Sequence, residues 1–250
     1  MSADLARSTD PLEQLAERLA LASARGRKRP APRAGVLASS IDHTLLRPDA
    51  TPAQIDRLCE EALAHGFAAV CVNGVHVRRC VRALERSPVA VCAVAGFPLG
   101  ACTSAVKRVE TARALEDGAD EIDVVVALGA LLGGDEPAAE RELAALARDC
   151  HAAGARLKAI LECGLLDERA KVRAAQIGRD AGCDFLKTST GFATGGATVA
   201  DVELLRRTVG RSVSIKAAGG IRDAGFARAL IAAGADRIGA SRSVEIVAES

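Results

Sequence analysis

The chain has 250 residues, 49% of them hydrophobic and 26% charged, which is enough for one barrel-sized domain or two smaller domains. The formal net charge of +1 excludes a general attraction to nucleic acid or to an anionic membrane, and the chain has neither Trp nor Tyr for base stacking. No apolar stretch reaches membrane-spanning length and the first residues have no signal-peptide core, so we expect a cytoplasmic protein.

Residues 1–34 differ from the rest of the chain. An Asp-Pro pair at positions 10–11 is typical of a helix start, because aspartate caps the first turn and proline fits it. Leucines follow at helical spacing as far as Gly26, and the next segment, RKRPAPR, is typical of a linker. We predict a helical extension with a linker over 1–34 and a catalytic domain over 35–250.

One pattern recurs from residue 35 onward. A helix-like stretch ends in glycine and a short apolar run follows it, as in AHGFAAVCV, EDGADEIDVVV and AAGADRIGAS. Such a glycine suits the left-handed turn that closes a helix before a buried strand. With SSIDHTLL and VAVCAVAGF, the pattern predicts eight strands. The helices expected after them cover 51–65, 73–86, 103–117, 135–153, 167–181, 197–209, 222–233 and 241–249.

Eight strand–helix units in one chain predict an α/β fold, a single (β/α)8 TIM barrel. An open doubly wound sheet is the alternative. That fold would favour a dinucleotide fingerprint or a phosphate loop after the first strand, and IDHTLLRPDA is neither. The barrel is therefore the preferred prediction.

Polar residues end most of the apolar runs, and in a barrel the strand ends meet at the rim that carries active sites. These residues are Asp42, Cys71, Asp123, Glu162, Lys187, Lys216 and Ser241. Strand alternation directs Asp123 and Lys216 into the barrel, and a buried carboxylate is costly unless it is paired. We therefore expect Asp123 to contact Lys187 and Lys216. Asp42 equally suits a helix cap, and Cys71 suits the core better than a nucleophile.

Lys187 and Lys216 each end an apolar run and precede a glycine-bearing loop, in LKTSTGF and IKAAGGIR. Consecutive barrel strands are neighbours, so the two amines should lie close together. A second ammonium disfavours the charged form of a lysine, which lowers its pKa and leaves a reactive free amine. The pair therefore predicts a lysine nucleophile; the alternative is an ion pair that only fills the barrel.

Three glycine-bearing loops follow the last three strands, where barrels commonly bind phosphate through backbone N–H groups. We predict that a phosphate group is bound by Gly191, Gly219, Gly220, Arg222, Gly239 and Ser241. None of the eight cysteines forms a C-x-x-C pair, and no histidine cluster has metal-ligand spacing. We expect no metal, no other cofactor and no disulfide.

Several of these motifs resemble the deoxyribose-phosphate aldolase family: IDHTLLRPDAT, GFPLG, DEIDVV, LKTSTGF, IKAAGGIR and RIGAS occur in the family's order over about residues 39–247. The resemblance implies a class I aldolase that reversibly cleaves 2-deoxy-D-ribose 5-phosphate to D-glyceraldehyde 3-phosphate and acetaldehyde. It also implies that Lys187 forms the Schiff base, that Lys216 perturbs it and that Asp123 relays protons. The partner is then a phosphosugar, with no nucleic acid or membrane, and a homo-oligomer, dimer or tetramer, stays open.

The chain departs from the family pattern at several positions. Ala127 stands where the family often has Asn, Ala218 where it often has Ser, and Arg242 where some members have a second Ser. Some members end in a catalytic tyrosine, which this chain lacks. Two other functions stay open: another class I phosphosugar aldolase, and a non-catalytic phosphosugar-binding barrel.

Overall fold

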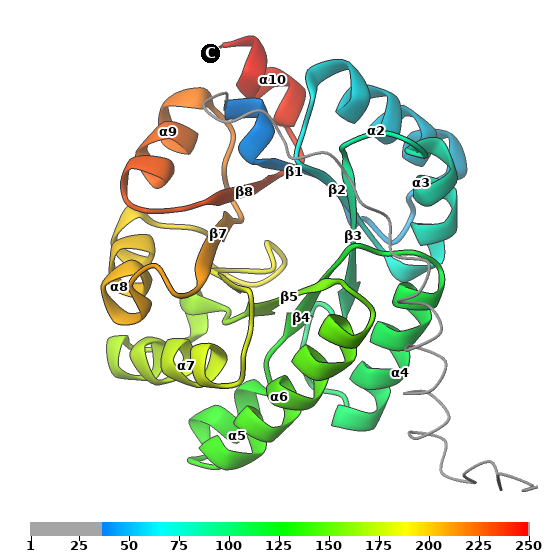
Figure 1. Cartoon of the computed structure of the whole chain (residues 1–250). Coiled ribbons are helices and arrows are strands. Elements are labelled where there is room, and N and C mark those ends of the chain that lie inside the picture. The colour runs from blue at the N-terminus through cyan, green and yellow to red at the C-terminus, as the bar shows by residue number, and fades with distance from the viewer. Residues whose placement is uncertain (1–36, 250) are drawn as a thin grey trace, which may run out of the picture.

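Eight parallel strands form a closed barrel in the computed structural model, which describes residues 37–249 (Figure 1). Each strand pairs with its neighbours in chain order, and the last pairs with the first. The strands are β1 (Ile41–Leu45), β2 (Ala69–Val72), β3 (Ala90–Ala95), β4 (Glu121–Val125), β5 (Arg156–Ile160), β6 (Phe185–Lys187), β7 (Ser214–Ala218) and β8 (Arg237–Ala240). The predicted TIM barrel is confirmed; the extension predicted over 1–34 lies outside the described residues.

The helices lie around the outside of the barrel (Figure 1). They are α2 (Pro52–His65), α3 (Val77–Ala83), α4 (Ser104–Glu116), α5 (Leu128–Leu132), α6 (Glu136–Ala152), α7 (Glu168–Asp180), α8 (Val199–Val209), α9 (Ala224–Ala232) and α10 (Ser243–Ala248), with 3-10 turns at Leu37–Ser40, Gly74–His76 and Cys163–Leu165. All eight predicted helices are present. The additional α5 escaped prediction because five residues containing a glycine are too short to show helical periodicity.

Local sequence sets where these helices begin and end. Thr51 accepts a hydrogen bond from the Gln54 backbone N–H while the Gln54 side chain accepts one from Thr51, so a complete capping box starts α2. Gly66 ends the same helix in the left-handed conformation, with φ 68°. Five further helices begin at a residue whose side chain accepts a hydrogen bond from a backbone N–H of the first turn: Thr103, Asp135, Asp167, Thr198 and Asp223.

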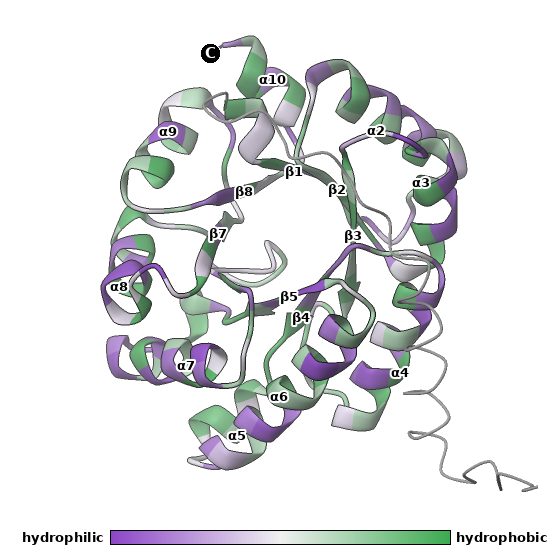
Figure 2. Ribbon diagram, viewed as in Figure 1, coloured by the Kyte–Doolittle hydropathy of each residue, from purple (hydrophilic) through white to green (hydrophobic). Residues whose placement is uncertain are grey.

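The strands bury both of their faces, but the two faces differ in chemistry. Outward residues such as Ile122, Val124 and Ile215 are fully buried in the apolar core that the helices cover. Inward positions carry charge, and Figure 2 shows hydrophilic colour interrupting the hydrophobic strands, for example on β5 and β8. A smaller apolar cluster lies apart from the main core: Leu46, Cys71, Cys92 and Val94, with Phe97 against it.

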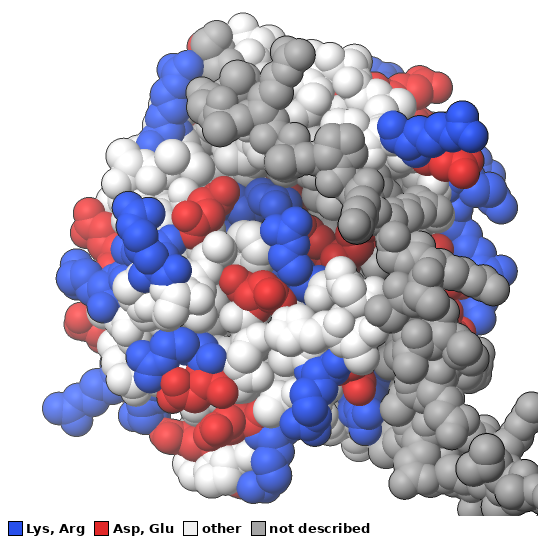
Figure 3. Space-filling model, in the orientation of Figure 1, with Lys and Arg blue, Asp and Glu red and all other residues white. Residues whose placement is uncertain are grey.

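The described residues also show the state of the cysteines, the hydropathy of the helices and the distribution of surface charge. All eight cysteines are free, and all but Cys102 are buried. None of the described helices combines the length and hydropathy that crossing a membrane requires. On the face shown in Figure 3, the described acidic and basic side chains are interspersed rather than gathered by sign.

Candidate active site

Lys187 is the last residue of β6 and lies between two strands that position it. Its backbone is in register with Ile160 of β5 and with Lys216 of β7. The adjacency expected for the two lysines is therefore confirmed. The Lys187 side chain is only 3% exposed, and its Nζ donates a hydrogen bond of 2.8 Å to Oδ2 of Asp123.

Asp123 is fully buried and receives three ammonium groups. Its Oδ2 lies 2.8 Å from Nζ of Lys187 and 2.8 Å from Nζ of Lys216. Its Oδ1 lies 2.8 Å from Nζ of Lys158. Burial opposes the charged form, but these three lysines outweigh it and hold the pKa of Asp123 well below its usual range. Asp123 is therefore a carboxylate, and the pairing with both predicted lysines is confirmed.

Lys216 contacts two carboxylates inside the barrel. Its Nζ lies 2.5 Å from Oδ2 of Asp42 and 2.8 Å from Oδ2 of Asp123. Burial by itself lowers the pKa of Lys216, but Asp123 and Asp42 more than offset burial and raise that pKa above the ordinary lysine value. Lys216 thus remains an ammonium. It shares one carboxylate oxygen with Lys187, so the two nitrogens lie within two hydrogen-bond lengths of each other.

The structure adds three charged residues that the sequence analysis did not single out. Lys158 lies 2.6 Å from Oε2 of Glu121, and Arg237 lies 2.5 Å from Oδ1 of Asp42 and 3.4 Å from both oxygens of Glu121. Glu121 lies two residues before Asp123 on β4, so it has the inward parity expected for Asp123. A charged residue within an otherwise apolar strand could have predicted each of these three positions.

Asp42 and Cys71 lie deeper than the rim. Asp42 is fully buried between Lys216 and Arg237, and Thr51 rather than Asp42 caps α2, so the alternative of a helix cap is wrong. Cys71 is fully buried, and its Sγ lies 3.9 Å from Oδ2 of Asp123. Neither side chain lines the pocket described next.

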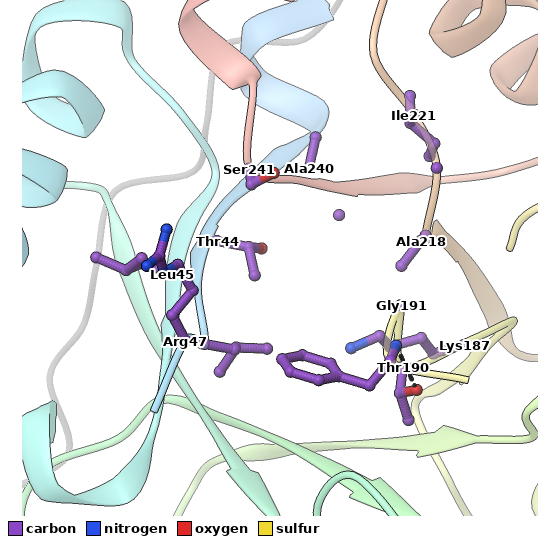
Figure 4. Close-up of a pocket in the computed structure, with 15 residues that line it drawn as sticks. Thr44, Leu45, Arg47, Lys187, Thr190, Gly191, Ala218, Ile221, Ala240 and Ser241 are labelled. Atoms are coloured by element: carbon purple, nitrogen blue, oxygen red, sulfur yellow. Dashed lines mark hydrogen bonds between the residues drawn. The ribbon is translucent and has the colours of Figure 1, made fainter. Parts of the chain in front are cut away.

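A pocket opens above Lys187 at the carboxyl ends of β6, β7, β8 and β1. Figure 4 shows Thr44 and Ser241 across this pocket from Lys187 and Thr190. Its lining includes most residues of the predicted phosphate site: Gly191, Gly219, Gly220, Gly239 and Ser241. Arg222 is exposed and lies outside the lining, whereas Arg47 and Phe192 are lining residues that the sequence analysis did not predict.

Backbone geometry keeps the glycine side of the pocket narrow. Gly219 has φ 94°, and a Cβ there would lie 3.1 Å from Cα of Gly196. The loop after Lys187 is held by Glu162, whose carboxylate accepts hydrogen bonds from the hydroxyl (2.5 Å) and the backbone N–H (3.2 Å) of Thr190. Glu162 has φ 52°, uncommon for a residue other than glycine. Backbone N–H groups can therefore face a ligand closely here.

The opposite side of Lys187 is apolar. The Phe97 ring centroid lies 5.8 Å from Nζ of Lys187, and the Phe192 ring meets Phe97 edge-on at 5.3 Å. Phe97 packs on the cluster that contains Leu46 and Cys71. One end of the site is thus apolar, and the other is lined by glycine-bearing loops.

Among the residues that the structure describes, two groups of buried side chains have atoms close enough to share a metal ion: Cys71, Cys92 and Asp123, and Asp42, Cys92 and Glu121. Lys158 already lies 2.8 Å from Oδ1 of Asp123, 2.6 Å from Glu121 and 3.1 Å from Sγ of Cys92. Lys216 lies against Asp42. Ammonium groups therefore meet these ligand atoms where a cation would sit, and the donor sets do not fit a metal.

The structure is a TIM barrel in which a lysine amine lines a rim pocket. That amine contacts a buried carboxylate, which a second lysine also contacts. This arrangement is typical of a lysine-dependent aldolase. The family model described as DeoC/LacD family aldolase matches residues 36–243, and the chain belongs to this family.

Similar proteins agree with that membership. The chain is 51% identical over 211 residues to the deoxyribose-phosphate aldolase of Geobacillus sp. strain WCH70, covering 84% of this chain and 94% of that protein. It is 52% identical over 208 residues to the enzyme of the same name from Brevibacillus brevis, covering 83% and 93%. Among solved structures, the tetrameric deoxyribose phosphate aldolase from Aeropyrum pernix matches with a TM-score of 0.80 and 35% identity, covering 93% of this chain and 96% of that one.

Proposed function

We propose that this protein is a deoxyribose-phosphate aldolase of the class I type, which reversibly cleaves 2-deoxy-D-ribose 5-phosphate to D-glyceraldehyde 3-phosphate and acetaldehyde. The observation that carries the proposal is Lys187, whose amine lies in the pocket floor and shares Oδ2 of Asp123 with Lys216. The relatives named above support the same substrate. The setting we propose is deoxyribose catabolism in the cytoplasm.

Lys187 is the proposed nucleophile. Its free amine attacks C1 of the open-chain sugar to give a carbinolamine, and loss of water leaves an iminium between Lys187 and C1. The iminium withdraws the electron pair of the C2–C3 bond as the C3 hydroxyl loses its proton. Glyceraldehyde 3-phosphate then leaves, and protonation of the enamine at C2 followed by hydrolysis releases acetaldehyde and the lysine.

Asp123 and Lys216 are the proposed proton-handling pair. Asp123 is a carboxylate in direct contact with the Lys187 nitrogen, so it can accept a proton there and return it to the departing water or, through water, to C2. Lys216 holds its proton and places a positive charge next to the Lys187 nitrogen, with which it shares Oδ2 of Asp123.

The 5-phosphate is proposed to bind at the glycine end of the pocket. Gly191, Gly219, Gly220, Gly239 and Ser241 line it and offer backbone and hydroxyl donors. The cations nearest in sequence, Arg222 and Arg242, are exposed beside the loops, so they contribute to the local field rather than to a closed cage. Neither a metal nor another cofactor takes part in this scheme, because the iminium is the electron sink.

The apolar end of the site, beside Phe97 and Phe192, favours acetaldehyde over the larger donor substrates of other lysine aldolases. Phe97 and Phe192 close the space beside Lys187, and Leu46 and Cys71 pack behind Phe97. A chamber of this kind suits the two carbons of acetaldehyde better than a phosphorylated three-carbon donor. We therefore favour deoxyribose 5-phosphate over the substrates of other class I phosphosugar aldolases, and over a barrel that only binds phosphosugars.

The test is borohydride reduction in the presence of deoxyribose 5-phosphate, followed by peptide mapping. We expect turnover of this sugar and a stable adduct on Lys187. Modification of another lysine would assign the nucleophile to that lysine, and absence of turnover with retained binding would favour the non-catalytic barrel.

We also propose that the protein is a homo-oligomer. Sedimentation analysis would distinguish a monomer, a dimer and a tetramer.

A further inference from the structure

A chain of ion pairs runs from the start of β8 to the site. Arg237 lies 2.5 Å from Oδ1 of Asp42, and the other oxygen of Asp42 lies 2.5 Å from Nζ of Lys216. Lys216 in turn lies 2.8 Å from Oδ2 of Asp123. Three contacts thus connect the Arg237 guanidinium, which does not line the pocket, to the carboxylate that contacts Lys187.

A second chain of contacts closes the first into a ring. From Asp123, Oδ1 lies 2.8 Å from Nζ of Lys158, which lies 2.6 Å from Oε2 of Glu121. Glu121 lies 3.4 Å from Arg237, where the first chain began. Acids and bases alternate around the whole circuit, which we call the charge ring: Arg237, Asp42, Lys216, Asp123, Lys158 and Glu121.

All six members of the charge ring are ionised and shielded from water. Arg237 is 6% exposed and the other five are fully buried. Burial opposes every one of these charges, yet the opposite charges in the ring overcome it: the pKa values of Asp42, Glu121 and Asp123 are lowered, and those of Lys158, Lys216 and Arg237 are raised. With three acids and three bases the ring itself is neutral, and the half-exposed Arg156 lies 3.4 Å from Glu121 outside it.

Lys187 is a seventh titratable side chain in this interior, and among the described residues it has no carboxylate that it does not share. Its contact is with Asp123, which already meets Lys216 and Lys158. The other groups around it are the Cys71 thiol, which is close enough to interact electrostatically, and the Phe97 ring. The Glu162 carboxylate accepts its hydrogen bonds from Thr190, on the loop that follows Lys187. A proton on Lys187 therefore adds an unbalanced positive charge to a buried, neutral network.

We propose that Arg237 is a positioning residue for this aldolase: by closing the charge ring it keeps the interior neutral when Lys187 is the free amine. The inference rests on the proposed function, because it takes Lys187 as the nucleophile. Loss of a ring cation leaves the ring with one negative charge in excess, which a protonated Lys187 would balance. Loss of a ring carboxylate leaves one positive charge in excess, which favours the free amine.

The experiment compares Arg237→Leu with Glu121→Gln. For each variant, the rate of imine formation at Lys187 is followed by borohydride trapping from pH 5 to 10, and its midpoint is determined. We expect the midpoint to rise by about one pH unit in Arg237→Leu and to fall in Glu121→Gln. Below the midpoint, one unit corresponds to about tenfold less free amine in Arg237→Leu. A structural role alone would lower the yield of folded protein without moving the two midpoints in opposite directions.

Two further variants serve as matched controls. Arg237→Lys keeps the charge and should keep the wild-type midpoint, even if the shorter reach weakens the fold. The double variant Arg237→Leu with Glu121→Gln restores a neutral ring and should bring the midpoint back toward wild type. If Arg237→Leu does not fold, Glu121→Gln and the double variant decide the question.

The proposal is overturned if Glu121→Gln leaves the midpoint unchanged, or if Arg237→Leu folds and its midpoint does not rise. The proposed function fails in a different way, through absence of the Lys187 adduct in the wild-type protein. The two failures are therefore distinguishable.

Discussion

The charge ring and the rim pocket share strands β1, β7 and β8, but their linings differ in chemistry. The ring is closed, dry and formed by side chains that each have partners of opposite charge. The pocket is lined on one side by glycines, where we propose that backbone N–H groups bind the phosphate. Lys187 stands at the boundary: its nitrogen touches the ring through Asp123 and its side chain lines the pocket. The buried ring thus holds the charges that surround Lys187, and the pocket is where we propose that the substrate binds.

Replacing the boundary residue should have the largest effect. Lys187→Ala should abolish essentially all turnover of deoxyribose 5-phosphate, because no other described lysine lines the pocket. The ring keeps its six members, so the free energy of unfolding should change little. Lys171→Ala on α7 is the control, since that lysine pairs with Asp201 away from the pocket. Full activity in Lys187→Ala would place the nucleophile elsewhere.

A change inside the ring should cost both activity and stability. Asp123→Asn keeps the shape but loses the charge that three ammonium groups share, so dehydration and proton transfer at C2 should slow about 10²–10⁴-fold. Breaking buried pairs in this way costs about 3–5 kcal/mol of unfolding free energy. Phosphate affinity, measured by inhibition with glyceraldehyde 3-phosphate, should be nearly unchanged. Near-normal turnover per folded molecule would make Asp123 a structural residue only.

Lys216→Leu should change the pH dependence of imine formation at Lys187 more than the affinity for the phosphosugar. The pKa of Lys216 is raised in the folded protein, so its positive charge is present throughout the working range and is lost completely in the variant. Loss of a constant cation next to Lys187 favours the protonated form of that amine, and the optimum for imine formation should move to higher pH, besides a lower rate. The rate of borohydride trapping as a function of pH measures this; a shift to lower pH would contradict it.

On the pocket side, a change should affect binding and leave the ring alone. Ser241→Asp places a negative charge against the 5-phosphate and should raise KM by about tenfold, which corresponds to about 1.4 kcal/mol. Ser241→Ala, which removes one donor without adding charge, should raise KM less. An unchanged KM in Ser241→Asp would mean that the phosphate binds elsewhere.

The smallest effect should follow from chelation. Lys158 and Lys216 already contact the buried carboxylates, so treatment with EDTA should leave the full rate of cleavage. Manganese-free and zinc-free buffers provide the comparison. A loss of activity that zinc restores would contradict the Schiff-base scheme.

The sequence by itself determined the barrel, its eight strands and most of its helix boundaries. These follow from short-range rules: Thr51 and Gln54 form a capping box within one turn, and Gly66 ends a helix through its own conformational freedom. Strand alternation also directed Asp123 and Lys216 inward, because the face of a strand residue depends only on its parity.

Only the tertiary structure decided which charges meet. Arg237 and Asp42 are 195 positions apart in sequence, and Glu121 pairs with Lys158 from the next strand. Strand parity indicates that a charged residue points into the barrel. How far its charged group lies below the rim depends on the stagger of the strands and on the length of the side chain. Asp42, expected at the rim or as a cap, lies in the ring for that reason, and the closure of the ring depends on contacts that no local pattern encodes.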